Sequence, residues 1–136
     1  MYVDYIDYAT GDIMPKKKNT RLSQSKSIYG LQAEICSALA SPVRLQILDL
    51  LSEEEKTASE LLEVLKIPKA NLSQHLAVLK DAGIIRSRKE GLFQYMSLSL
   101  PKIKDACALV RSVLLEKIAF EEKQNSELIR ELRAQR

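Results

Sequence analysis

The sequence has too few cysteines, histidines and glycines for most sites at which proteins perform covalent or metal chemistry. It contains two cysteines, Cys36 and Cys107, a single histidine, His75, and four glycines. The cysteines are far apart and form no closely spaced pair, which argues against a disulfide scaffold and a zinc finger. No glycine-rich phosphate loop and no pair of catalytic carboxylates accompanies the histidine. We therefore expect neither an enzyme nor a cofactor.

Long apolar runs are also missing. No stretch approaches the roughly 18–20 residues that span a bilayer, and the first twelve residues contain Asp4, Asp7 and Asp12 instead of the basic start of a secretory signal. We therefore expect a cytoplasmic protein with no membrane partner. The net charge of +3 is small, so the placement of the charges has to indicate any nucleic-acid partner.

The chain of 136 residues is long enough for one compact domain with terminal tails. Residues 1–25 are polar and aperiodic, which predicts a flexible arm, and the lysines at 16–18 are typical of a solvated tail or, alternatively, of a contact to the DNA backbone. Residues 26–120 are expected to form the folded domain. Residues 121–136 are mostly charged and predict a helical extension.

Hydrophobic periodicity predicts four helices, over about residues 27–40, 42–52, 57–65 and 69–82. The second has apolar residues around most of its circumference, so we expect it to be buried at the centre of the domain. The acidic run at 53–55 predicts an exposed turn between the second helix and the third.

Local signals mark the ends of these helices. Ser41 and Pro42 start the second helix, because a serine hydroxyl caps free N–H groups and proline loses no needed donor there. Thr57 and Glu60 have the spacing of a capping box for the third helix. Gly83 supplies the left-handed residue that ends the fourth.

Two segments rich in β-favouring residues follow, at 84–88 and 92–98, and Lys89-Glu90-Gly91 between them has the composition of a hairpin turn. From about Pro101 the helical pattern returns and continues to the C-terminus. Its apolar stripe contains Ile103, Cys107, Val110, Leu114 and Ile118. The expected fold is mainly α with a small β-hairpin wing, in the order ααααββα of a winged helix-turn-helix.

The fourth helix has the pattern of a helix that reads DNA in the major groove. Leu72, Leu76 and Leu79 share the face that packs inward. The polar residues near its start face outward: Lys69, Asn71, Ser73 and Gln74. Amide side chains pair with adenine, and serine and lysine bind base edges or phosphates. A merely solvated face is the alternative interpretation, and the basic hairpin that follows makes DNA binding the better one.

The predicted wing adds further donors. Arg86, Arg88, Lys89 and Gln94 lie close together in the sequence and suit phosphate or minor-groove contacts. Tyr95 is interpreted either as one of these donors or as a core residue. For His75 two interpretations also stay open, a phosphate donor or a buried structural group.

Three stretches in this order resemble the ArsR/SmtB family of winged-helix repressors: residues 38–48 (ALASPVRLQIL), 73–85 (SQHLAVLKDAGII) and 88–95 (RKEGLFQY). The resemblance extends over about half of the chain, from Leu31 to Leu98. It implies a homodimer built from the first and last helices, which binds double-stranded palindromic operator DNA and leaves it when an inducer binds.

The chain departs from its metal-sensing relatives. The third helix and the last helix lack the cysteine and histidine sets that such relatives carry, so we expect no metal site of the usual kinds. Cys36 and Cys107 lie on the two helices that should form the dimer, and we interpret them as thiols that sense oxidants or reactive sulfur. Inert packing, an atypical metal site between protomers and an unknown inducer are the alternatives, and a protein-interaction module is the rival function.

Overall fold

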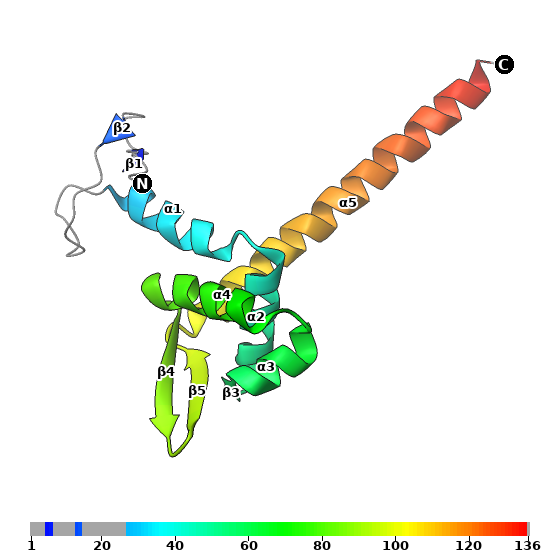
Figure 1. Ribbon diagram of the computed structural model, residues 1–136. Coiled ribbons are helices and arrows are strands. Elements are labelled where there is room, and N and C mark those ends of the chain that lie inside the picture. Colours follow the sequence, from blue (N-terminus) through cyan, green and yellow to red (C-terminus); the bar gives the residue numbers. More distant parts are fainter. Residues whose placement is uncertain (1–4, 7–12, 15–26, 136) are drawn as a thin grey trace. The chain divides into compact units, whose positions relative to one another are not determined.

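The computed structural model describes residues 5–6, 13–14 and 27–135 (Figure 1). The chain divides into two compact units, Met1–Ser99 and Leu100–Arg136. From residue 28 onward, the first unit contains four helices and three strands. In chain order they are α1 (Ile28–Leu39), α2 (Pro42–Glu53), β3 (Lys56–Thr57), α3 (Ala58–Leu65), α4 (Lys69–Asp81), β4 (Ile85–Glu90) and β5 (Phe93–Leu98). Helix α5 (Lys102–Ala134) forms the second unit. The predicted fold class is confirmed, with β3 as an element that the sequence pattern did not indicate.

Two short strands precede these elements. Strand β1 (Tyr5–Ile6) pairs antiparallel with β2 (Ile13–Met14). Both belong to the segment for which a flexible arm is predicted. The lysine run of that segment, at 16–18, lies outside the described residues.

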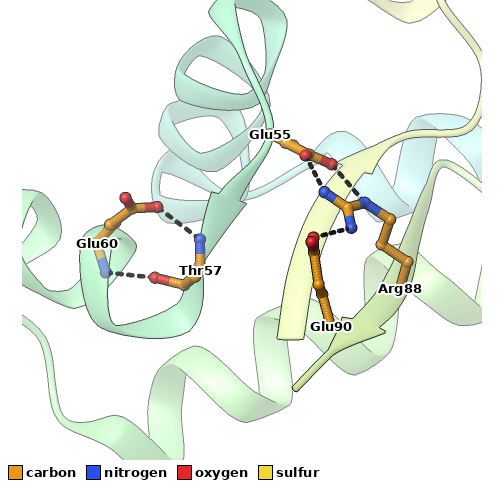
Figure 2. A network of polar contacts seen from close by, with 5 residues as sticks. All are labelled: Glu55, Thr57, Glu60, Arg88 and Glu90. Atoms are coloured by element: carbon orange, nitrogen blue, oxygen red, sulfur yellow. Dashed lines mark hydrogen bonds and ion pairs between the residues drawn. The ribbon is translucent and has the colours of Figure 1, made fainter. Parts of the chain in front are cut away.

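The predicted caps of two helices are confirmed. The Ser41 hydroxyl accepts a hydrogen bond from the backbone N–H of Arg44, 3.4 Å away, at the start of α2. At the start of α3, the Glu60 carboxylate accepts from the Thr57 backbone N–H at 2.7 Å, and the Thr57 hydroxyl accepts from the Glu60 N–H at 3.3 Å (Figure 2). Each residue therefore satisfies a donor of the other that the helix leaves unpaired.

Helix α4 ends in a Schellman motif around Gly83, which confirms the predicted stop. Gly83 has a φ of +73°, and its N–H donates to the Lys80 carbonyl. The N–H of Ile84 donates to the Leu79 carbonyl, and both of these side chains are fully buried. The motif turns the chain sharply from α4 into β4.

The core of the first unit is built from aliphatic side chains of α2, α3, α4 and the sheet: Ile47, Leu48, Leu51, Leu61, Leu72, Leu76, Leu79, Ile84, Ile85 and Met96. Helix α2, which we expected to be buried at the centre of the domain, is buried along the side that carries Ile47, Leu48 and Leu51. Leu45 is 43% exposed and Leu50 is half-buried. The reason is that α1, α3, α4 and β5 pack around only part of the helix.

The sheet has the antiparallel order β3-β5-β4. Strand β4 continues through Glu90, and the loop to β5 consists of Gly91 and Leu92 alone. The predicted turn at Lys89-Glu90-Gly91 was therefore placed too early. Gly91 has a φ of +60°, which suits the first central position of a two-residue type II′ turn. The two-residue loop lets Lys89 and Glu90 pair with Gln94 and Phe93.

Helix α5 is continuous over 33 residues, so the boundary expected at residue 120 falls inside it. Many of its apolar side chains are exposed, among them Val110, Leu114, Ile118, Leu128, Ile129 and Leu132. In the described part of the chain, no single helix combines the length and apolar character needed to cross a membrane. Only α1 and α2 taken together, bent by 89° at their junction, meet that test.

Candidate nucleic-acid interface

Helix α4 separates apolar from polar side chains as predicted. Leu72, Leu76 and Leu79 are buried, with exposed fractions of 1%, 7% and 0%. The polar residues at the start of the helix are exposed: Lys69, Asn71, Ser73 and Gln74. The buried leucines fix the orientation of α4, so its hydrogen-bonding groups form a row on the solvent side.

The start of α4 is open to anions. Pro68 occupies the N-cap and provides no side-chain acceptor, so N–H groups of the first turn and the positive end of the helix dipole are available to a phosphate. A three-residue turn joins α3 to α4, and Lys66 in this turn adopts the left-handed conformation, with a φ of +51°. The two helices and this turn form a helix-turn-helix (Figure 1).

The ring of His75 is held by Arg44. The Nη1 of Arg44 lies 3.4 Å from the Nδ1 of His75. Because a guanidinium has only donors, Nδ1 accepts this bond and the ring hydrogen is on Nε2. Arg44 also donates from Nε to the Ala38 carbonyl at 2.6 Å and from Nη2 to the Ser37 carbonyl at 3.3 Å. The half-buried His75 therefore has a structural contact on one side of its ring, while Nε2 remains a donor.

The wing residues fall on two faces of the β4–β5 ribbon, because side chains alternate along a strand and directly paired residues share a face. The pairing register assigns each residue to one face. We call the face with the buried residues Ile85 and Met96 the core face and the opposite one the outer face. The core face contains Ile85 and Leu98 at the base of the hairpin, then Ser87 and Met96, and further out Lys89 and Gln94. The outer face contains Arg86, Arg88, Glu90, Phe93, Tyr95 and Ser97. The wing donors predicted as one set are thus divided between opposite faces.

On the core face, the side-chain amide of Gln94 donates to the Ser87 hydroxyl at 3.1 Å, and Lys89 is the exposed cation of the neighbouring position. On the outer face, the Arg88 guanidinium lies 4.7 Å from the centroid of the Tyr95 ring. Tyr95 is half-buried, so it both contacts the arginine and covers the sheet.

Arg88 is surrounded by carboxylates (Figure 2). Its Nε donates to Glu55 at 3.1 Å and its Nη2 to the other oxygen of the same carboxylate, while its Nη1 donates to Glu90. These hydrogen bonds lower the pKa of Glu55, an effect that desolvation opposes and the positive charge of Arg88 reinforces. They also raise the pKa of Arg88. The stabilisation from Glu55 is therefore present above its unfolded-state pKa and is lost as the pH falls through the lowered folded-state value.

Two residues of this interface had no role in the sequence-based prediction. Glu55 was part of an acidic run interpreted as an exposed turn, and it lies 33 positions from Arg88, so no local spacing relates the two. Arg44 belongs to a stretch that carries the family resemblance, which was its only signal. Both act through the tertiary fold, which brings α2 and its following loop to α4 and to the sheet.

The cysteines lie in different units, Cys36 on α1 and Cys107 on α5. Cys36 is exposed, Cys107 is half-buried, and neither forms a disulfide. Over the described residues, no three side chains of the His, Cys, Asp and Glu types come together in a way that could hold a metal ion.

Comparison with known proteins relates this geometry to a family. A family model described as a helix-turn-helix domain matches residues 39–88, which run from the end of α1 into β4. The HTH-type transcriptional regulator Rv0081 of Mycobacterium tuberculosis is 38% identical over 92 residues, which are 67% of this chain and 81% of that protein. Its crystal structure matches with a TM-score of 0.65 over 71% of this chain and 98% of that chain, at 36% identity.

A second solved structure is the homodimeric winged helix-turn-helix DNA-binding domain Mb0332 of Mycobacterium bovis, described as a possible ArsR-family regulator. It has a TM-score of 0.62 at 28% identity and covers 72% of this chain and 91% of that chain. This chain belongs to the ArsR/SmtB family of transcriptional regulators. The ArsR/SmtB family consists of DNA-binding proteins and not of enzymes. This confirms the prediction that the chain is not an enzyme. In the vocabulary of this family, α3 and α4 form the helix-turn-helix, and β4 and β5 form the wing.

Another relative is the transcriptional repressor SdpR of Bacillus subtilis. It is 36% identical over 72 residues, which are 53% of this chain and 80% of that protein.

Proposed function

We propose that the chain is a homodimeric transcriptional repressor that binds operator DNA in the cytoplasm. The exposed polar row on α4 is the observation that carries this function, because a helix with buried leucines on one side presents Asn71, Ser73 and Gln74 to base edges in the major groove. Lys69, the uncapped start of α4 and the Nε2 donor of His75 suit the flanking phosphates. SdpR, a transcriptional repressor by name, supports repression as the outcome.

Two helices support the homodimer. On α1, Ile28 and Tyr29 are 69% and 62% exposed, and α5 exposes the predicted stripe at Val110, Leu114 and Ile118. Apolar faces of this extent are typical of surfaces that pair with another protein. A homodimer with two-fold symmetry carries two copies of α4, which matches a palindromic operator. Mb0332 is itself homodimeric, which supports the proposed dimer.

The direct test compares base reading with phosphate binding. We expect Gln74→Ala to weaken binding to the operator by about 1–3 kcal/mol and binding to random DNA much less, because the lost contact is to a base. Ser73→Ala is expected to act similarly. Lys69→Ala is the control, and should weaken both DNAs alike and reduce the salt slope of log K by about one. The measurement is a titration of the DNA upstream of the chain's own gene and of a random duplex. Equal losses for Gln74→Ala on both duplexes would remove it from the base-reading set.

For the release of DNA, we propose a thiol signal. Cys36 and Cys107 lie on the two helices that carry the exposed apolar faces, and Cys36 is open to solvent. Lys104 and Arg111, about one turn either side of Cys107, favour its thiolate and make it the attacking group, with Cys36 as its partner. A link between them would change the spacing of the two α4 helices, which has to match one DNA turn of roughly 34 Å.

We expect peroxide or polysulfide to lower the operator affinity of the wild type at least tenfold, about 1.4 kcal/mol, and to leave Cys36→Ser and Cys107→Ser bound. With peroxide, the two thiols give up two protons and two electrons, and peroxide becomes two water molecules as the disulfide forms. Mass spectrometry identifies the product. The same titration is repeated with Zn(II), Ni(II) or Co(II) at micromolar concentration. These metals should not change the operator affinity, because the usual ligand sets are absent from the sequence. Equal release of all three proteins, or of none, would assign the cysteines to packing, and a tenfold effect of a metal would instead favour an atypical metal site.

A further inference from the structure

Arg88 differs from the other cations of the wing in what surrounds it. Glu55 binds it through two oxygens, Glu90 binds it through a third, and the Tyr95 ring lies beneath it. In the part of the chain that the structure describes, neither Arg86 nor Lys89 has a carboxylate partner. A cation whose charge is already compensated attracts a phosphate less than a cation that is free. Arg88 is therefore the wing cation least available to the DNA backbone.

The position of Arg88 in the sheet is also distinctive. Strand β3 supports the wing at only two rungs, where Lys56 pairs with Met96 and Thr57 pairs with Tyr95. Arg88 pairs with Tyr95 from the other side, so it stands at the last rung that the third strand reaches. The outer rungs, including Lys89 with Gln94, form a two-stranded ribbon, and such ribbons are only marginally ordered by themselves.

From this rung, Arg88 reaches across the middle strand. The sheet order is β3-β5-β4. The guanidinium of Arg88 on β4 lies over the ring of Tyr95 on β5. It binds Glu55, which directly precedes β3 (Figure 2). A bidentate arginine–carboxylate pair fixes direction as well as distance, because both groups are planar. The contact therefore ties the outermost rung that β3 reaches back to the residue that precedes β3 in the body of the first unit.

We propose that Arg88 is a positioning residue, which together with Glu55 holds the wing in place so that Lys89 meets the DNA backbone. This inference rests on the proposed function and changes the role predicted for Arg88, from a phosphate contact to a clamp. Lys89 lies one residue beyond the clamp, on the core face of the ribbon, and has no carboxylate to compete with a phosphate.

The charge-neutralising variant Glu55→Gln makes opposite predictions for the two roles. It makes the protein more positive and removes one of the two carboxylates that bind Arg88. If Arg88 contacts phosphate, this variant binds DNA more tightly. If Arg88 is a clamp, the variant binds more weakly, because the wing is no longer held. The sign of the change therefore decides between the two roles.

The experiment is a titration of two duplexes by the full chain over a range of salt concentrations, one of mixed sequence and one from upstream of its own gene. We expect Glu55→Gln and Arg88→Gln each to weaken binding by about two- to fivefold, the range of a well-formed surface ion pair, with unchanged salt slope and no further loss in the double variant. Lys89→Gln should reduce the salt slope by about one. Arg86→Gln is the matched control for the loss of one positive charge, because Arg86 lies on the same strand and face as Arg88 but does not bind Glu55. Tighter binding by Glu55→Gln, or a slope reduced by about one in Arg88→Gln, would overturn the clamp.

A second measurement tests the clamp without DNA. Hydrogen exchange of the wing amides in the free protein should accelerate in Glu55→Gln and Arg88→Gln beyond the Arg88–Tyr95 rung, and should not change in Arg86→Gln or Lys89→Gln. Unchanged exchange in the first two variants would contradict the clamp. If the wild type binds neither duplex while exchange responds as expected, the proposed function fails and the clamp stands.

Discussion

Replacing Leu79 with alanine is expected to lower the free energy of unfolding by about 2–5 kcal/mol, the range observed when a buried leucine is truncated and its cavity remains. The side chain is fully buried, with an exposed fraction of 0%. The residue also belongs to the Schellman motif, since its carbonyl accepts the N–H of Ile84 at 3.0 Å. Leu79 thus anchors the end of α4, the proposed DNA-reading helix, and the start of the wing together, and its loss is expected to weaken DNA binding as well.

Val78→Ala is the matched control, because Val78 is the neighbouring residue of the same helix and is 39% exposed. Its effect should stay below about 1 kcal/mol, as is usual for substitutions outside the core. Denaturant titrations give both values, and they have to be run at one protein concentration because the stability of the proposed dimer depends on it. Similar losses for the two variants would mean that Leu79 is not the anchor of this region.

The helices of the fold follow from short-range physics, which is why the sequence alone predicts them. Ser41, Thr57 with Glu60, and Gly83 each act on backbone groups within a few residues, and all three are confirmed as helix ends. The strand β3 escaped prediction because it has two residues and exists only through its pairing with β5. The turn was placed too early for a similar reason. Lys89 and Glu90 have turn-like composition, but their partners Gln94 and Phe93 extend the ladder and shorten the loop.

The candidate site likewise has one part that the sequence alone predicts and another that depends on the tertiary fold. The outward row on α4 follows from helical periodicity, since three leucines on one face place Asn71 and Gln74 on the opposite side. The wing does not follow from its composition. Its cations were predicted as one cluster, whereas the strand pleat separates Lys89 from Arg88 and the tertiary fold supplies Glu55 as a partner for Arg88 alone. Charge density in the sequence therefore indicates a nucleic-acid partner but does not identify which cations are available to it.

Arg44→Met is expected to lower the free energy of unfolding by about 1.5–3 kcal/mol, the range for lost hydrogen bonds that involve a charged group. Arg44 donates to the carbonyls of Ser37 and Ala38 and to the ring of His75. The two carbonyls belong to the last turn of α1, where carbonyls lack the usual helical donor four residues further on. The Ser37 carbonyl also accepts the Ala40 N–H at 3.1 Å. His75 lies on α4, so a single side chain joins the end of the proposed dimer helix to the proposed DNA-reading helix. Methionine keeps much of the aliphatic length and removes all three donors.

The coupling of Arg44 to His75 separates this linking role from simple capping of α1. His75→Leu removes the acceptor at Nδ1, whereas His75→Asn keeps an oxygen near the same place and should retain most of the stability and operator affinity. In a double-mutant cycle, Arg44→Met and His75→Leu should be non-additive by at least about 0.5 kcal/mol, because both break the same contact. Arg44→Lys is expected to resemble Arg44→Met, since an ammonium is a point donor without the planar fork that reaches three acceptors. Additive losses, with His75→Asn as damaging as His75→Leu, would show that Arg44 only caps α1 and that α4 is positioned by its leucines alone.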